Sequence, residues 1–193
     1  MRLMVLSAIS RDSSTCYMLA NNIVEICQSH GVDVDFAHPA NVNVPVNDGT
    51  VAWDLPEAKA WQERIAETDA HIWVSPEYHS AMTGGFKNLF DYLVKEPLKG
   101  DVVGLCALAG GAMAALNTLN GMSVMARSLG AWVAPDYIAM NSNEVKEGLQ
   151  EGSERRLRAM CHEVIDGARR FNASFTGDYG ILSAADGGTL ADL

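Results

Sequence analysis

Five short apolar runs alternate with stretches of helical periodicity along this chain. The apolar runs lie at residues 2–7, 32–37, 70–75, 101–109 and 131–140. The helical stretches lie at residues 16–29, 56–67, 85–95, 112–129 and 153–171. Strands that are joined through helices form parallel sheets, because each crossover returns the chain to the edge where the previous strand began. The run 101–109 is apolar nearly throughout, which is typical of a strand covered on both faces.

Residue types that begin and end helices support these boundaries. Gly130 follows one stretch, and glycine adopts the left-handed conformation that ends many helices. Pro56 suits the first turn of a helix because its fixed φ is already helical. Ser153 is of a type favoured at the N-cap, so we expect it to begin the last helix. Residues 38–55 and 141–150 show no periodicity, and we expect loops there.

The length of 193 residues and the order of these elements predict one α/β domain. We expect a three-layer sandwich with a five-stranded parallel sheet in the order 2-1-3-4-5 and right-handed crossovers. In such a sheet, ligands bind at the carboxyl edge, between the first and third strands. The domain is expected to cover residues 1–175, and residues 176–193 to form a loose tail.

Charge and hydropathy argue against several classes of function. The chain has 14 Lys and Arg residues against 24 Asp and Glu residues, a net charge of −10. A nucleic-acid surface needs a basic patch, so we expect no nucleic-acid partner. The longest apolar stretch, residues 102–116, is interrupted by glycines and is shorter than the roughly 20 residues of a membrane span. Residues 1–6 are too short an apolar run for a signal peptide.

The four cysteines, Cys16, Cys27, Cys106 and Cys161, lie far apart in the sequence. Because they include no C-x-x-C pair, we expect neither a metal centre nor a redox dithiol. Such spacing is typical of reduced thiols in a cytoplasmic protein, where cysteines serve as small buried hydrophobes.

The loop after the first strand, residues 7–16, reads S-A-I-S-R-D-S-S-T-C and is rich in hydroxyl groups. Hydroxyls and the free amides of the following helix donate hydrogen bonds to phosphate oxygens, and the helix dipole favours negative charge. The Arg11 guanidinium can add a charge-assisted contact. The loop therefore predicts a phosphate site, and the alternative is a helix-capping loop with a solvated arginine. The candidate residues are Ser10, Arg11, Ser13, Ser14, Thr15 and Cys16.

The loop after the third strand begins at Pro76, which fixes a turn, and leads into an amphipathic helix. Planar cofactors bind in the crevice above a parallel sheet. We expect the amides of Glu77, Tyr78 and His79 to face such a cofactor, with the Tyr78 ring lying against it. The alternatives are a half-buried aromatic residue at Tyr78 and a plain turn residue at His79. The Glu77 side chain is expected to hold the loop rather than to act as a general acid.

Residues 75–93 read S-P-E-Y-H-S-A-M-T-G-G-F-K-N-L-F-D-Y-L. They resemble the signature P-E-Y-N-x-S-x-P-G-x-L-K-N-x-x-D-W of the NAD(P)H-dependent FMN reductases, a flavodoxin-like family. The matching residues are Pro76, Glu77, Tyr78, Gly84, Lys87, Asn88 and Asp91. The first loop is similar to the family's G-S-x-R-x-x-S-x-N at Arg11 and Ser14, and residues 129–135 to its L-G-A-x-V-x-P strand. The departures from the family pattern are Ala8, Ile9, Cys16, His79 and Thr83.

The resemblance implies a flavodoxin-like fold and an oxidoreductase. Hydride would pass from NAD(P)H through bound FMN to a small-molecule acceptor such as a flavin or a quinone, without a catalytic side chain or a metal. A third FMN loop is implied at Ala109, Gly110 and Gly111, where small residues let the backbone approach the ring. The alternative there is an ordinary turn before a helix.

The resemblance also implies a homodimer or homotetramer, with the helix that carries Lys87 and Asp91 at the interface. These residues are four apart, so the alternative is a solvent-exposed helical ion pair. Two other functions stay open for the whole chain. One is a flavodoxin-like electron carrier or flavin-binding regulatory protein without nicotinamide turnover. The other is a related scaffold that has lost its cofactor.

Overall fold

The computed structural model describes residues 1–50, 55–94, 96–111 and 115–174. The described strands are β1 (Arg2–Ser7), β2 (Asp33–Ala37), β3 (Ala70–Pro76), β4 (Val102–Ala109) and β5 (Trp132–Asn141). They form a parallel sheet in the order β2-β1-β3-β4-β5. The predicted sheet and its strand order are confirmed.

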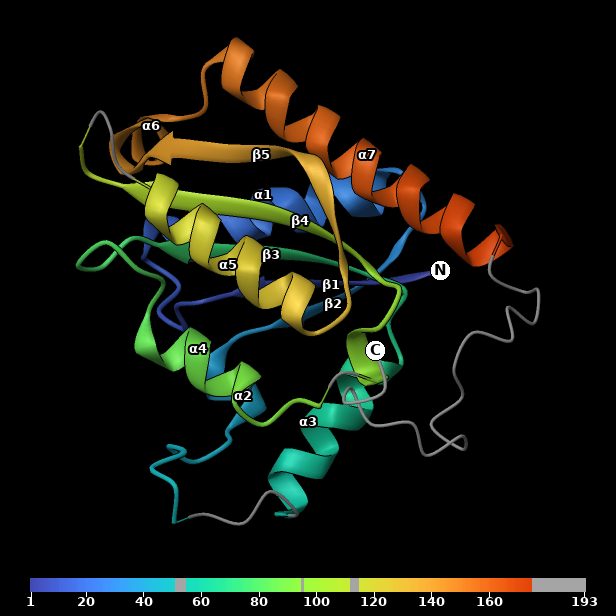
Figure 1. Cartoon of the computed structure of the whole chain (residues 1–193). Coiled ribbons are helices and arrows are strands. Elements are labelled where there is room, and N and C mark those ends of the chain that lie inside the picture. Colours follow the sequence, from blue (N-terminus) through green and yellow to red (C-terminus); the bar gives the residue numbers. More distant parts are fainter. Residues whose placement is uncertain (51–54, 95, 112–114, 175–193) are drawn as a thin grey trace, which may run out of the picture.

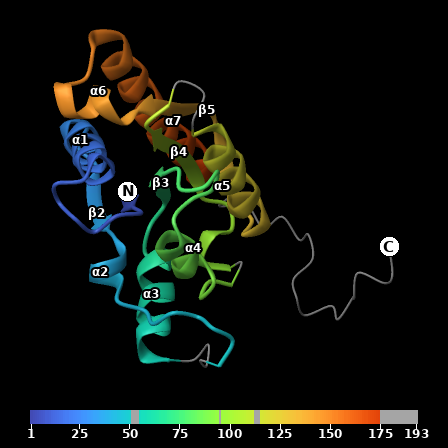
Figure 2. The same cartoon turned by 90° about the vertical axis from the view of Figure 1, so that its left-hand side faces the viewer.

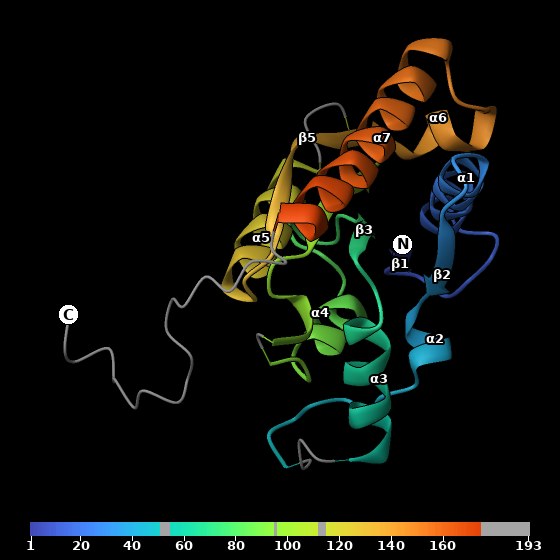
Figure 3. The same cartoon turned by 90° about the vertical axis from the view of Figure 1, so that its right-hand side faces the viewer.

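Helices cover both faces of this sheet (Figure 1). On one face, α1 (Thr15–Ser29) and α7 (Glu151–Ser174) pack against the strands and against each other. On the other face lie α3 (Pro56–Ala66), α4 (Gly84–Phe90) and α5 (Leu116–Ser128). Figures 2 and 3 show the strands between these two layers from both sides. The predicted three-layer sandwich is therefore confirmed.

The central strand β3 shows why its sequence is apolar without alternation. Ile72 and Trp73 point to opposite faces, and both are fully buried. The Trp73 ring packs against Phe86 and Phe90 of α4, with ring centroids 6.0 and 4.5 Å apart. Ile72 lies beside Gly104 of β4 on the face that α7 covers. A strand buried on both faces needs apolar side chains in both directions.

The helix α7 approaches β4 closely at Gly104. A Cβ atom placed on Gly104 would lie 2.6 Å from Met160 Sδ and 2.7 Å from Val164 Cγ2. Both distances are shorter than non-bonded carbon and sulfur atoms tolerate, so a residue without a side chain is needed here. This glycine sets the separation between the sheet and α7.

Two stretches predicted as loops contain short helices. α2 (Pro39–Val42) begins at a proline whose φ suits a first turn and ends at Asn43 in the left-handed conformation. α6 (Ser142–Glu147) begins after Asn141, whose side chain accepts a hydrogen bond from the Asn143 amide at 2.8 Å. Helices of four and six residues are too short to show a hydrophobic period, so the sequence pattern missed both.

Two of the predicted helices have different ends. α4 stops at Phe90 instead of continuing to residue 95. Beyond it the Leu93 amide donates to the Phe90 carbonyl over 3.0 Å, a bond to the third preceding residue that is typical of a turn and not of an α-helix. A 3₁₀ turn, η1 (Glu96–Leu98), follows it. α7 begins at Glu151, so the prediction of Ser153 as its N-cap is wrong, and Ser153 lies inside the helix.

α5 begins at Leu116, after Ala115 in the N-cap position. The start predicted at residues 112–114 lies outside the described residues, as does the predicted tail at residues 176–193. Of the helices that the structure describes, none is long and apolar enough to cross a membrane.

Candidate functional site

The loops that follow β1, β3 and β4 meet at the carboxyl edge of the sheet, on the left in Figure 1. The Ala8 amide donates to the Val74 carbonyl over 2.8 Å, and the Glu77 amide donates to the Leu108 carbonyl over 2.7 Å. The Thr83 hydroxyl donates to the Ala8 carbonyl over 3.4 Å. Because β1 and β3 are neighbours from which the chain continues in opposite directions across the sheet, this edge is the topological switch point.

The first turn of α1 has free donors that face this edge. Ser14 is the N-cap, and its hydroxyl accepts a hydrogen bond from the Tyr17 amide at 3.1 Å. Within the described residues, the amides of Thr15 and Cys16 donate no hydrogen bond. Arg11 is exposed, and its guanidinium makes no ion pair with any described residue. Free amides at a helix start beside an unpaired cation are what a phosphate group requires.

The serine hydroxyls of this loop have different surroundings. The Ser10 hydroxyl accepts a hydrogen bond from the Ala40 amide at 2.9 Å and so ties the loop to α2. Ser13 is exposed and Thr15 is half-buried. Ser10 and Ser14 therefore already accept hydrogen bonds inside the protein, but their hydroxyl hydrogens can still be donated to a ligand.

The Cys16 side chain points into the core, where its thiol lies 3.6 Å from the Ser7 hydroxyl. It is 1% exposed, and its thiol donates to the Val74 carbonyl at 3.3 Å. Burial raises the pKa of this thiol to about 11, although its hydrogen bond with the Ser7 hydroxyl lowers the pKa in part. Because the thiol is buried, the backbone amide is the part of Cys16 that can still contact a ligand. The helical spacing of Cys16 with Leu19 and Ile23, both buried, is the sequence signal for this orientation.

The second loop is a tight hairpin turn. The Tyr78 amide donates to the Ala81 carbonyl at 2.8 Å, and the Ala81 amide donates back at 3.1 Å. The two central residues, His79 and Ser80, have φ values of 50° and 64°. Positive φ at both central positions defines a type I′ turn. Histidine and asparagine are both enriched at positive φ, which explains why His79 can replace the family asparagine.

Two of the three predicted ring-facing amides are already paired. The Glu77 amide donates to the Leu108 carbonyl and the Tyr78 amide to the Ala81 carbonyl, so neither amide is free to donate to a ligand in this structure. Within the described residues, the His79 amide donates no hydrogen bond. The Tyr78 side chain is 54% exposed at the same turn, free to lie against a planar ligand. These pairings depend on the turn type and on the register with β4, which the sequence does not reveal.

The third loop leaves the backbone accessible after β4. Ala109 is buried, whereas Gly110 and Gly111 are exposed. A Cβ atom placed on Gly110 would meet nothing within 4 Å, so open space lies beside this residue. The Glu77 carboxylate accepts a hydrogen bond from the Thr118 amide of α5 at 3.1 Å and thereby holds the second loop to this region. Glu77 has the holding function predicted for its side chain.

The phosphate end of FMN fits the residues at this edge, since two amides at the start of α1 and an arginine in the loop before it have no partner among the described residues. A family model described as NADPH-dependent FMN reductase matches residues 1–145. The chain belongs to this family. Membership supports an oxidoreductase with FMN as cofactor and NAD(P)H as co-substrate.

Individual relatives agree with the family assignment. An NADPH azoreductase of Bacillus sp. (strain OY1-2) is 30% identical over 112 residues, which are 58% of this chain and 61% of that protein. The NADPH-dependent FMN reductase ArsH of Acidithiobacillus ferrooxidans is 27% identical over 172 residues, 86% of this chain and 69% of that protein. The chain thus spans less than two thirds of the azoreductase.

An oxidoreductase from Corynebacterium diphtheriae has a similar structure, with a TM-score of 0.71 and 18% sequence identity. The alignment covers 88% of this chain and 97% of that structure. At such low identity the likeness concerns the fold alone. The predicted flavodoxin-like class agrees with a flavodoxin from the domain Archaea, which has a TM-score of 0.61 and 14% identity over 88% of this chain and 99% of that structure.

The reductase signature K-N-x-x-D has a local structural function in α4. Lys87 and Asp91 form an ion pair along the helix, and both side chains are partly exposed. Asn88, for which no function was predicted, joins α4 to the long loop between α2 and α3. Its side-chain amide donates to the Pro45 carbonyl at 2.8 Å, and its oxygen accepts from the Asn47 amide at 2.8 Å. The fixed place of Asn88 in the signature is the signal that pointed to it.

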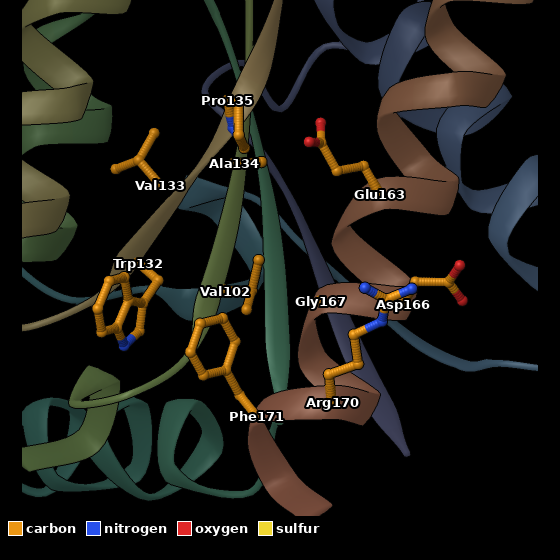
Figure 4. A pocket seen from close by; sticks show the side chains of 10 residues that line it. All are labelled: Val102, Trp132, Val133, Ala134, Pro135, Glu163, Asp166, Gly167, Arg170 and Phe171. Atoms are coloured by element: carbon orange, nitrogen blue, oxygen red, sulfur yellow. The ribbon is translucent and has the colours of Figure 1, made fainter. Parts of the chain in front are cut away.

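A cavity of about 650 Å³ lies elsewhere in this protein, between β5 and α7 (Figure 4). Val102 and Trp132, which line it, are the first residues of β4 and β5. The cavity is therefore near the amino ends of these strands, and its lining includes none of the predicted site residues. Ligands of parallel sheets bind at the carboxyl edge, so the three loops form the candidate site.

Proposed function

We propose that this protein passes electrons from NAD(P)H, through bound FMN, to a flavin, a quinone or a similar small acceptor. The observation that carries the proposal is the start of α1. There the amides of Thr15 and Cys16 are unpaired within the described residues, and Arg11 stands beside them without an ion pair. This group lies at the switch point of the sheet, where cofactors of such folds bind.

Each of the three loops has a part in holding FMN. Arg11 and the first-turn amides of α1 would bind the phosphate, with Ser10, Ser13 and Ser14 as further hydroxyl donors. Tyr78 would lie against the ring, and the His79 amide would donate to its polar edge. Residues 109–111 would approach the ring with their backbone. When bound, FMN supplies the redox chemistry, and the protein positions it and its partners.

The proposed class of acceptor follows from the exposure of the ring end. Tyr78, Gly110 and Gly111 are all exposed, so a second planar molecule could reach a ring bound between the loops. A relative of this chain is named an azoreductase and another an FMN reductase. Flavins, quinones and azo compounds are planar molecules that accept electrons, which agrees with an open stacking face.

The test begins with an absorbance spectrum of the purified protein after addition of FMN, recorded before and after anaerobic NADPH. Protein-bound flavin that NADPH bleaches supports the proposal. Stopped-flow reoxidation with free FMN, a quinone or an azo dye then identifies the acceptor class. Bound flavin that neither NADPH nor NADH bleaches would indicate an electron carrier or sensor, and protein that binds no FMN would reject the proposal.

We also propose that the protein forms a homodimer or homotetramer in the cytoplasm. Val124, Trp132 and Tyr137 are large exposed hydrophobic residues on α5 and β5, and such surfaces often mark interfaces. The four free, buried thiols are compatible with a reducing compartment. Light scattering of the wild type, Val124→Glu and Lys87→Glu distinguishes an α5 interface from the predicted α4 interface, because only one substitution should dissociate the oligomer.

A further inference from the structure

Glu77 of the second loop contacts the chain on both sides of the third loop, residues 109–111. Its backbone amide donates to the Leu108 carbonyl at the end of β4 over 2.7 Å. Its carboxylate Oε2 accepts a hydrogen bond from the Thr118 amide over 3.1 Å. One residue therefore fixes the chain before and after the segment that is proposed to approach FMN.

The helix α5 has no cap of its own. Its N-cap residue, Ala115, lacks a side-chain acceptor and has a φ of 82°. Thr118 is the third residue of this helix, and its amide is one that an N-cap side chain normally satisfies. Glu77 lies 41 residues away in the sequence and supplies both the missing acceptor and the negative charge that a helix start favours.

We infer that Glu77 is a positioning residue, which sets the separation of the second and third loops and so fixes the ring end of the site before FMN binds. This inference rests on the proposed function. A site that is already ordered loses less conformational entropy when its ligand binds. Removal of the Glu77 carboxylate should therefore weaken FMN binding through disorder of the third loop, without loss of a direct contact.

The test compares Glu77→Ala and Glu77→Gln with the control Glu57→Ala. Glu57 is exposed in the first turn of α3, so its removal changes the net charge equally. Two quantities are measured, the dissociation constant of FMN and the hydrogen exchange of the peptide that contains Thr118 in FMN-free protein. The exchange reports the cap on α5 independently of any ligand.

We expect Glu77→Ala to weaken FMN binding roughly tenfold and to speed exchange in the first turn of α5. Glu77→Gln keeps an acceptor oxygen, so its FMN affinity should lie within about threefold of the wild type, with intermediate exchange. It also keeps the test decisive if Glu77→Ala does not fold. Glu57→Ala should match the wild type in both measurements.

Wild-type affinity and wild-type exchange in Glu77→Ala would overturn the inference. So would weakened FMN binding with unchanged exchange, because Glu77 would then act on FMN directly. Failure of the wild type to bind FMN is a separate result that rejects the proposed function. The exchange rates of the FMN-free variants would even then decide whether Glu77 holds the two loops together.

Discussion

At the scale of single residues, the candidate site contains hydrogen-bonding groups that are free and groups that the fold already uses. The amides of Thr15, Cys16 and His79 donate no hydrogen bond within the described residues, whereas those of Glu77 and Tyr78 are paired. The free donors are concentrated at the phosphate end. Phosphate recognition should therefore contribute more to FMN affinity than recognition of the polar edge of the ring.

Arg11 gives the first prediction. We expect Arg11→Ala to weaken FMN binding roughly tenfold, because a charge-assisted contact to the phosphate is lost. The FMN affinity of Arg11→Lys should lie between those of the wild type and Arg11→Ala, since lysine keeps the charge but lacks the planar guanidinium. Isothermal titration calorimetry measures the change. Arg156→Ala, an exposed arginine on α7, is the control and should leave the affinity unchanged. Equal affinities of Arg11→Ala and the wild type would remove Arg11 from the site.

At the scale of secondary structure, the sheet and its helices are fixed by close contacts. The approach of α7 to β4 at Gly104 predicts that Gly104→Ala lowers the free energy of unfolding by about 1–3 kcal/mol. The added Cβ would press on Val164, whose branched side chain has little room to move, and on the more flexible Met160. Denaturant unfolding monitored by circular dichroism measures the loss.

Gly152→Ala is the control for this prediction, because Gly152 lies in α7, the helix that approaches Gly104, and a Cβ there would meet nothing within 4 Å. It should be neutral or stabilise the protein by up to about 1 kcal/mol, as alanine favours helices over glycine. A stable Gly104→Ala protein would show that α7 can move away from the sheet.

The ion pair between β2 and α3 gives a pH-dependent prediction. Arg64 donates from Nε and Nη2 to the two oxygens of Asp35, at 2.9 and 2.6 Å, and the Asp35 side chain is 9% exposed. The hydrogen bonds and charge of Arg64 lower the pKa of Asp35. Because the folded state favours the carboxylate, its contribution to stability is complete above the unfolded pKa of about 4 and is lost as pH falls through the lowered pKa.

Asp35→Asn should therefore lower the free energy of unfolding by about 1–2 kcal/mol at pH 7, and this difference from the wild type should shrink below about pH 4. Urea unfolding at several pH values measures it. Asp33→Asn, at an exposed position on the same strand, should change stability by less than about 0.5 kcal/mol. A difference for Asp35→Asn that is constant with pH would contradict the role of the charge.

The elements with a hydrophobic period could be predicted from the sequence, whereas the backbone hydrogen bonds within the loops could not. The strands and long helices are readable because their hydrophobic spacing extends over several turns or pleats. The site could be located because three polar or glycine-containing loops follow neighbouring strands. The paired amides of Glu77 and Tyr78 could not be predicted, since a turn with positive φ at His79 and the register with Leu108 arise only in the folded chain.

At the scale of the whole molecule, FMN binding and folding are linked, because a ligand that binds only the folded state stabilises it. At an FMN concentration a hundred times the dissociation constant, the gain is about 2.7 kcal/mol. For a domain of this size that gain corresponds to a rise in Tm of about 5–10 °C. Thermal unfolding followed by far-ultraviolet circular dichroism, which flavin fluorescence does not disturb, measures it.

Riboflavin separates the two ends of the site, since it has the ring of FMN without the phosphate. The free donors at the start of α1 predict a clearly smaller rise in Tm with riboflavin than with FMN at equal concentration. Arg11→Ala should reduce the FMN effect toward that of riboflavin and leave the riboflavin effect unchanged. Equal effects of the two flavins on the wild type would show that the ring accounts for the affinity. The amides at the start of α1 would then not bind the phosphate of FMN.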